Sequence, residues 1–196
     1  MFGNCTRLPL LHIQTTTELV STVSMFQYCS ELTNVNLFNT SKVTTASSMF
    51  AVCPKLPSIP YYDWSSLTYA DSMFHTCHAL VLQPDQYNFP SLNNGNAMFF
   101  DCRSLQTISV LNIPKCTVAS QMFMKCNALK SITIPIGITT INANAFTGSG
   151  LTKVIFNGED EPNGCDDNAF IETNLQHVEV LITYKSTNFC NLIPRT

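Results

Sequence analysis

A short motif that recurs at a fixed interval constrains this chain more than any other feature of its sequence. The pattern Met-Phe-x-x-Cys-x-x-Leu begins at six places, and successive copies start 24 residues apart, once 25. These copies start at Met1, Met25, Met49, Met73, Met98 and Met122. Two degenerate copies follow, in which Ala145-Phe146 and Ala169-Phe170 replace Met-Phe. Because a constant period is the signature of a stacked repeat protein, the sequence predicts a solenoid of about eight coils.

The residues after each motif predict short β-strands. In the unit that begins at Met122, the apolar residues Leu129, Ile132 and Ile134 are separated by polar ones. Alternation of this kind is typical of a strand that is buried on one face. The repeat length lies within the ~20–29 residues of leucine-rich repeats, in which each unit adds one strand to a shared sheet. We therefore expect a solenoid of the α/β repeat class, with one parallel β-sheet and short helical or 3₁₀ return turns.

The repeats divide the chain into a solenoid and a tail. The predicted solenoid covers residues 1–182, with units that start near residues 1, 25, 49, 73, 98, 122, 145 and 169. Residues 183–196 match no repeat, and we expect them to form a C-terminal capping tail, because the ends of a solenoid need a cover. The first unit starts inside the motif without such a cover. We therefore expect either that the chain is part of a longer protein or that neighbouring chains of an assembly pack on the N-terminal coil.

Composition and charge exclude several classes of partner. Charged residues make up 12% of the chain, and its formal net charge is −3. Nucleic-acid binding is not expected, because the sequence has no basic block that could neutralise a phosphate backbone. A membrane span is not expected either, because Thr, Pro and Gly break the apolar stretches well below the ~18 residues required. The start of the chain also lacks the basic and apolar regions of a signal peptide.

Nine cysteines raise the question of disulfides, metal sites and catalysis. Six of them occupy the same motif position: Cys5, Cys29, Cys53, Cys77, Cys102 and Cys126. Stacked strands lie ~4.8 Å apart, which exceeds the ~3.8 Å between the Cβ atoms of a disulfide, so we expect an inward-facing structural ladder of free thiols. A residue that recurs in every unit is no special nucleophile, and the sequence contains no C-x-x-C zinc pattern. We therefore predict no catalytic residue and no metal site.

Two features outside the repeat leave alternatives open. Cys165 and Cys190 lie outside the ladder and could form a disulfide, although two free thiols are the favoured interpretation. The acidic stretch from Glu159 to Asp167 could hold Ca²⁺ through its oxygen atoms, although a solvated loop is the ordinary interpretation. We therefore predict no cofactor.

The most regular units resemble a known repeat family. One of them reads Ser48-Met49-Phe50-Ala51-Val52-Cys53-Pro54-Lys55-Leu56 and is preceded by Thr40-Ser41-Lys42-Val43-Thr44. This pattern is similar to the BspA-like leucine-rich repeats, and the similarity extends over nearly the whole chain. The resemblance implies a place on the surfaces of gut and oral bacteria or certain parasitic protists, or in phages and appendages that meet such surfaces. It also implies adhesion and protein binding in place of catalysis, although one fold hosts many functions.

The outward positions of the strands predict a binding surface with little charge. The candidate binding residues are Asn34 and Asn36 on one strand and, just beyond the strands, Phe38, Tyr61, Tyr62 and Trp64. Exposed aromatic side chains are enriched in interfaces, although Tyr and Trp also fill the corners of solenoids. A low-charge surface of this kind suits a protein or glycan ligand.

Two functional hypotheses follow. The first is a non-catalytic, surface-displayed module for protein binding and adhesion. The alternative is a structural subunit or segment of a larger assembly, such as a virion, fibre or appendage. Either hypothesis places the protein at a cell surface, in the extracellular space or on a virion.

Overall fold

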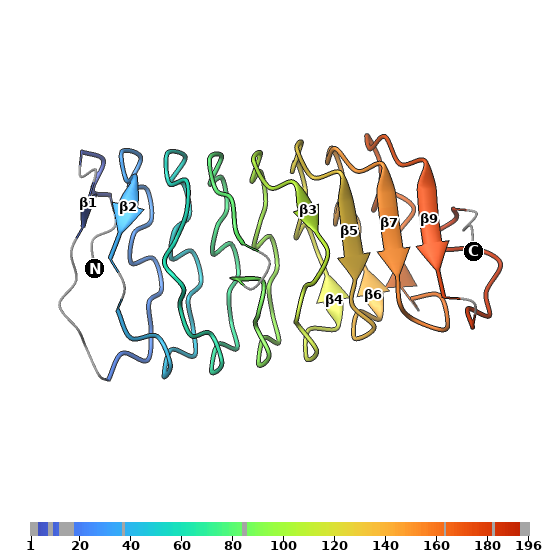
Figure 1. Cartoon of the computed structure of the whole chain (residues 1–196), viewed down its shortest axis with the longest axis horizontal. Helices are drawn as coiled ribbons and strands as arrows, with labels where there is room; N and C mark the ends of the chain where they lie inside the picture. Colours follow the sequence, from blue (N-terminus) through green and yellow to red (C-terminus); the bar gives the residue numbers. More distant parts are fainter. Residues whose placement is uncertain are drawn as a thin grey trace.

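The chain winds into an elongated parallel β-solenoid, with the N-terminal coils at one end of its long axis and the C-terminal coils at the other (Figure 1). This computed structural model describes residues 4–7, 10–11, 18–36, 38–83, 86–162, 164–181 and 183–192. The start of the first repeat at Met1 and the last part of the predicted tail, residues 193–196, lie outside these ranges.

The strands within these ranges pair in parallel and form three separate sheets. The first sheet pairs β1 (Leu10–Leu11) with β2 (Asn34–Val35). The second has the order β3 (Thr107–Ile108), β5 (Ser131–Ile134), β7 (Lys153–Phe156) and β9 (His177–Val180). The third has the order β4 (Val118–Ala119), β6 (Thr140–Ile141) and β8 (Gly164–Cys165). In Figure 1 the second and third sheets lie along different sides of the same C-terminal coils.

The parallel pairing confirms the solenoid, but the prediction of one sheet through eight coils is wrong. Regular strand pairing covers fewer coils, and the largest sheet has four strands. Between β2 and β3 the expected strand positions hold Pro57 and Pro60. A proline has no N–H group to donate, so it interrupts a ladder of strand hydrogen bonds. A backbone hydrogen bond from Val81 N to Pro57 O, at 2.9 Å, still joins two neighbouring coils in this stretch.

The prediction of helical return turns is also wrong, because the described residues contain no α-helix and no regular 3₁₀ segment over the Met-Phe motifs. The motif instead forms tight turns whose N–H groups donate alternately within the turn and to the next coil. Met49 N donates to Ala46 O at 3.0 Å, whereas Phe50 N donates to Met73 O at 2.9 Å. A helix needs consecutive N–H groups to donate to carbonyls four residues back. Half of these donors are committed to the neighbouring coil, so no helix forms.

Stacked phenylalanine rings form the centre of the core. The ring centroids of successive motif phenylalanines are 4.9–5.8 Å apart, and their planes differ by 4–11°. The stack contains Phe26, Phe50, Phe74, Phe99, Phe123, Phe146 and Phe170. The motif leucines and most motif methionines pack beside it as buried residues. The fixed repeat length therefore places like residues above one another, and each coil buries its neighbours' apolar surface.

A disulfide fastens the C-terminal segment to the solenoid. Cys165 and Cys190 are bonded, with their Cα atoms 5.1 Å apart, so the favoured interpretation as free thiols is wrong. Phe189 is buried, and its ring centroid lies 5.0 Å from that of Phe156. Glu161 accepts a hydrogen bond from Cys190 N at 2.7 Å. The segment from residue 183 to 192 is thus tied to the preceding coils by covalent, apolar and polar contacts.

Candidate binding surface

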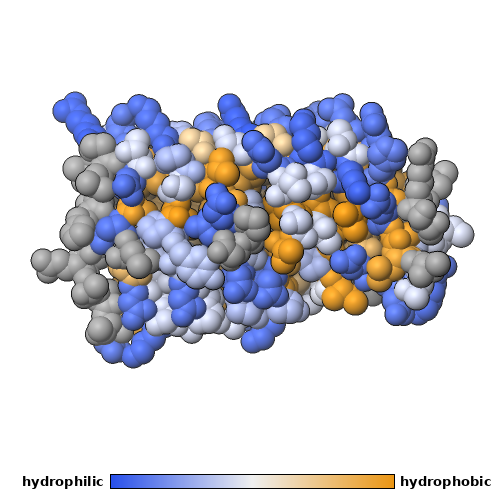
Figure 2. Space-filling view, in the orientation of Figure 1, coloured by the Kyte–Doolittle hydropathy of each residue, from blue (hydrophilic) through white to orange (hydrophobic). Residues whose placement is uncertain are grey.

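The strand face carries polar and apolar groups side by side. Figure 2, in the orientation of Figure 1, shows hydrophobic surface along the middle of this face and hydrophilic surface at its margins. Asn34 is exposed on β2, and Asn36 just after that strand is half-buried. Farther along the chain, Val110 and Ile136 are exposed apolar residues that follow β3 and β5. The described part of the chain contains no helix that is long and apolar enough to cross a bilayer.

Three of the predicted aromatic contact residues are core residues. Phe38, Tyr62 and Trp64 are only 3%, 5% and 4% exposed, so the prediction that their rings are exposed is wrong, although Tyr62 and Trp64 still line a hollow at this place. Their rings pack together, with centroid distances of 4.9 Å for Phe38–Tyr62 and 5.2 Å for Tyr62–Trp64. Tyr62 Oη donates to Asn36 O at 3.0 Å, and burial raises the pKa of Tyr62 well above its usual value. We call these three residues the aromatic corner. They fill a corner of the solenoid, which is the alternative to an interface that the sequence left open.

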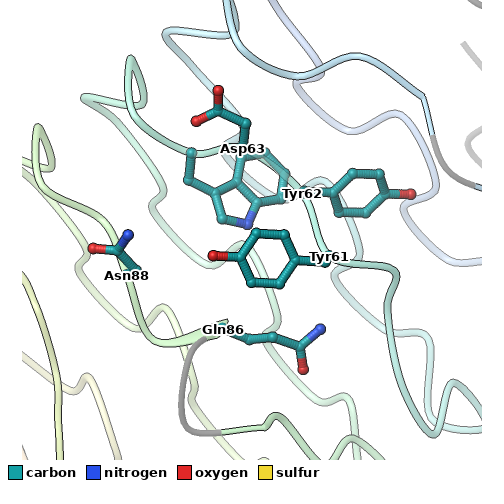
Figure 3. Close-up of a pocket in the computed structure, with 6 residues that line it drawn as sticks. Tyr61, Tyr62, Asp63, Gln86 and Asn88 are labelled. Carbon is teal, nitrogen blue, oxygen red and sulfur yellow. The ribbon is translucent and has the colours of Figure 1, made fainter.

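Tyr61 is the exception, because this residue is 59% exposed. It borders a hollow of about 330 Å³ on the outside of the aromatic corner. The hollow is lined by Tyr61, Tyr62, Asp63, Trp64, Gln86 and Asn88. Figure 3 shows the Tyr61 ring lying across the hollow, with its hydroxyl toward Asn88, whereas the Tyr62 ring runs the opposite way. We refer to this feature as the Tyr61 hollow.

Neighbouring coils fix the polar walls of the Tyr61 hollow. Gln86 Nε2 donates to Ile59 O at 2.9 Å, which ties the segment before Tyr61 to the next coil. Asn88 Oδ1 accepts a hydrogen bond from Asn112 Nδ2 at 2.6 Å. That bond holds the Asn88 amide in place and leaves its nitrogen on the side of the hollow in Figure 3.

Sequence reasoning missed Asp63, Gln86 and Asn88 as members of this site. A usable signal was present, because Asn88 stands one 24-residue period after Trp64. In a parallel solenoid, residues one period apart lie side by side on adjacent coils. Reading the chain at the repeat spacing, in addition to along each strand, would have brought the Asn88 amide next to the aromatic corner.

The cysteine ladder consists of free thiols, all buried except the half-buried Cys5. The thiols of Cys53, Cys77, Cys102 and Cys126 each donate to the carbonyl of a motif phenylalanine in the preceding coil, as Cys77 Sγ does to Phe50 O at 3.0 Å. Burial raises the pKa of Cys53 to about 12 and that of Cys126 to about 12. A nucleophilic cysteine needs an accessible, ionised sulfur, so these thiols are unsuited to catalysis.

The carboxylates of the acidic loop bind side chains of the C-terminal segment. Glu159 and Asp160 form ion pairs with Lys185, at 3.2 and 3.5 Å. Asp167 accepts a hydrogen bond from Asn191. No group of three or more His, Cys, Asp or Glu side chains among the described residues is placed to hold a metal ion.

A second polar cluster surrounds Asp101, which is buried on the side of the Met-Phe turns. Its carboxylate accepts hydrogen bonds from Arg103 Nε at 2.8 Å and from His78 Nε2 at 2.9 Å. Burial alone would raise the pKa of Asp101, but the bonds from Arg103 and His78 outweigh it and hold that pKa below its usual value. The cluster joins adjacent coils through a charged network, and its lone pairs are already engaged by protein groups.

Comparisons with known proteins address the family and the fold. A family model described as "Mycoplasma protein of unknown function, DUF285" matches residues 20–134. No curated protein matches the chain significantly in sequence. A leucine-rich repeat protein from Bacteroides ovatus has a similar structure, with a TM-score of 0.57 and 16% identity over 90% of this chain. A leucine-rich cell surface protein from Faecalibacterium prausnitzii gives a TM-score of 0.46 and 21% identity over 91% of this chain.

The chain is shorter than both of these solved structures. It spans 56% of the Bacteroides protein and 61% of the Faecalibacterium protein. At this level of identity the Bacteroides structure shows the leucine-rich repeat fold and nothing about ligands.

Proposed function

Because this chain belongs to the family described as Mycoplasma protein of unknown function, DUF285, and to the BspA-like leucine-rich repeat proteins, we propose that it is a non-catalytic binding module displayed on a cell surface. Its role is adhesion to a protein or glycan partner. The buried, weakly acidic thiols of the cysteine ladder support a role without covalent catalysis.

The observation that carries the proposal is the exposure of Tyr61 beside an aromatic corner that buries its other rings. A large aromatic side chain left in solvent on a fixed segment is the kind of group that anchors an interface. Asn34 and Asn36 on the first part of the strand face are the proposed polar contacts. Phe38, Tyr62 and Trp64 support this surface from beneath.

Adhesion of coated beads to cells tests the proposal. Beads carrying the full chain are expected to bind epithelial cells that display surface glycoproteins, and Tyr61→Ala is expected to remove most of this binding. Tyr69→Ala is the matched control, because Tyr69 is similarly exposed, at 52%, but does not line the Tyr61 hollow. Equal binding by coated and bare beads would contradict the proposal.

The oligomeric state of the purified chain distinguishes the adhesion module from a subunit of a larger assembly. Light scattering after size-exclusion chromatography is expected to give a monomer for the adhesion module. Concentration-dependent oligomers that survive Tyr61→Ala, together with absent adhesion, would favour the assembly role instead.

A further inference from the structure

We propose that the Tyr61 hollow is a binding site for a neutral saccharide. The inference rests on the proposed binding function and deepens it by naming the class of ligand. Three properties of the hollow carry the inference: an exposed aromatic ring, hydrogen-bonding groups that no described residue engages, and a described lining that contains no cationic side chain.

The exposed ring supplies a stacking surface. One face of a pyranose ring consists of C–H groups, which pack against the electron-rich face of an aromatic ring. More than half of the Tyr61 side chain is open to solvent, and Figure 3 shows its ring lying across the hollow. Gln86 binds the carbonyl of Ile59 two residues earlier, so the segment that carries the ring is held in place before any ligand arrives.

The indole of Trp64 supplies a hydrogen-bond donor that the protein leaves unused. The Trp64 side chain is more than nine-tenths buried and lines the hollow. None of the described residues accepts a hydrogen bond from its Nε1. That atom is also not sealed in the core, since Ser149 Oγ is the one fully buried side-chain nitrogen or oxygen without a partner in the described part of the chain. A buried indole normally finds an acceptor for its N–H, so a ligand oxygen is the expected partner.

Asp63 and Asn88 complement this donor. Asp63 uses Oδ1 to accept a hydrogen bond from Ser65 N at 2.9 Å, and its second oxygen remains available as an acceptor. Asn88 uses Oδ1 for Asn112, and its Nδ2 remains available as a donor. Each hydroxyl of a sugar both donates and accepts, so a pair of neighbouring hydroxyls satisfies a carboxylate and an amide together.

Size and charge narrow the ligand class further. The hollow of about 330 Å³ is at the lower end of the ~300–1,000 Å³ of small-molecule sites, which suits a sugar ring better than an extended peptide. Among the described residues that line it, Asp63 alone carries a charge. A carboxylate repels an anionic ligand, so neutral sugars are favoured over uronic or sialic acids.

The single tryptophan of the chain makes the test direct, because Trp64 lies in the proposed site. The full chain is titrated with methyl glycosides of neutral hexoses and N-acetylhexosamines, with their oligosaccharides, and with matched uronic acids. Trp64 fluorescence and saturation-transfer NMR are the two readouts. The expected result is saturable binding of at least one neutral sugar at millimolar concentration, and weaker binding of its uronic acid.

Variants locate the binding at this site. Tyr61→Ala is expected to weaken binding of that sugar about tenfold, which corresponds to ~1.4 kcal/mol. Tyr61→Phe keeps the stacking ring and is expected to keep most of the affinity, whereas Asn88→Ala is expected to reduce it. Tyr69→Ala is the control and is expected to leave affinity unchanged, because Tyr69 lies outside the hollow. An unchanged unfolding midpoint in each variant shows that the fold is intact.

Failure of the saccharide site can be distinguished from failure of the proposed adhesion function. Absence of any saturable fluorescence or NMR response, or equal affinity in wild type and Tyr61→Ala, overturns the saccharide site even if coated beads adhere. Sugar binding without bead adhesion overturns the proposed surface role and leaves the site standing. A glycoprotein probed before and after removal of its glycans distinguishes a protein-linked sugar from a free oligosaccharide as the source of the ligand.

Discussion

At the scale of single residues, the repeat assigns a fixed role to each motif position, and the cysteine position is the clearest case. A thiol is small enough for the tight turn, apolar enough for the core and able to donate weakly to a carbonyl. Cys53 Sγ lies 3.1 Å from Phe26 O, and Cys126 Sγ lies 3.0 Å from Phe99 O. The ladder therefore stabilises the protein only while its sulfurs keep their protons.

This property predicts a loss of stability at alkaline pH. Burial holds the pKa of Cys53 and Cys126 at about 12 in the folded protein, against an ordinary thiol pKa of 9.0. Between these values the unfolded chain has released a proton that the folded chain retains, so rising pH favours unfolding. Each such thiol is expected to lower the free energy of unfolding by ~1.4 kcal/mol per pH unit in this window. Urea unfolding from pH 8 to 11 measures the slope.

The control for this experiment removes one titrating group. The titration is run in reductant on the Cys165→Ser/Cys190→Ser background, which prevents disulfide exchange. Adding Cys126→Ser is expected to reduce the dependence of the free energy of unfolding on pH by the contribution of one thiol, ~1.4 kcal/mol per pH unit. An identical slope with and without Cys126→Ser would contradict the shifted pKa.

At the scale of elements, the Met-Phe turn links neighbouring coils. Its backbone contains non-glycine residues in a conformation that is unfavourable in free energy. In each regular copy, one residue before the methionine and one before the cysteine adopt a left-handed conformation. In the unit at Met49 these residues are Ser48, with φ of 56°, and Val52, with φ of 60°. The conformation lets Phe50 N and Val52 N reach carbonyls of the next coil, at 2.9 and 2.8 Å. Hydrogen bonds between coils thus compensate for unfavourable backbone angles.

Val52 is the position where this cost can be measured. A β-branched residue is strongly disfavoured at positive φ, whereas asparagine tolerates it. Val52→Asn is expected to raise the free energy of unfolding by about 0.5–1 kcal/mol. Val81→Asn is the matched control, because Val81 is an exposed valine outside the positive-φ set, and no gain is expected there. Equal effects of the two substitutions in chemical denaturation would show that the backbone angle is not the cause.

At the scale of the whole molecule, stability is distributed along one axis. Each coil contacts its neighbours, so damage at one end does not require the other end to unfold. The C-terminal segment is joined through the Cys165–Cys190 disulfide, which closes a loop of sequence separation 25. We propose that this segment serves as the C-terminal cap, because Phe189 and Glu161 make contacts that cover the last coils.

Removing the Cys165–Cys190 disulfide is expected to destabilise only the C-terminal coils. Closing a loop of this length stabilises by roughly 3 kcal/mol in the chain-entropy description. In Cys165→Ser/Cys190→Ser, faster amide hydrogen exchange is expected in β8, β9 and residues 183–192. Exchange in the turns around Phe50 and Phe74 should stay as in the wild type. Wild-type exchange rates throughout the variant would show that the disulfide does not hold the cap.

The sequence by itself determined the repeat, its period, the parallel solenoid and the burial of the motif residues in its core. It could do so because a constant period places equal residues above one another, whatever path the chain takes between them. The place of Tyr61 just beyond the predicted strands marked it as a contact residue, whereas its polar neighbours Gln86 and Asn88 come from the next coil and were not predicted.

Only the tertiary structure decided three features of the molecule. Turns replace helices because the donors of Phe50 and Val52 bind carbonyls of the next coil, a contact that no single unit contains. Cys165 and Cys190 meet because the C-terminal segment folds back on the solenoid. The aromatic corner is buried and Tyr61 is exposed because rings from two coils compete for one enclosed space, and packing between coils sets which ring is left outside.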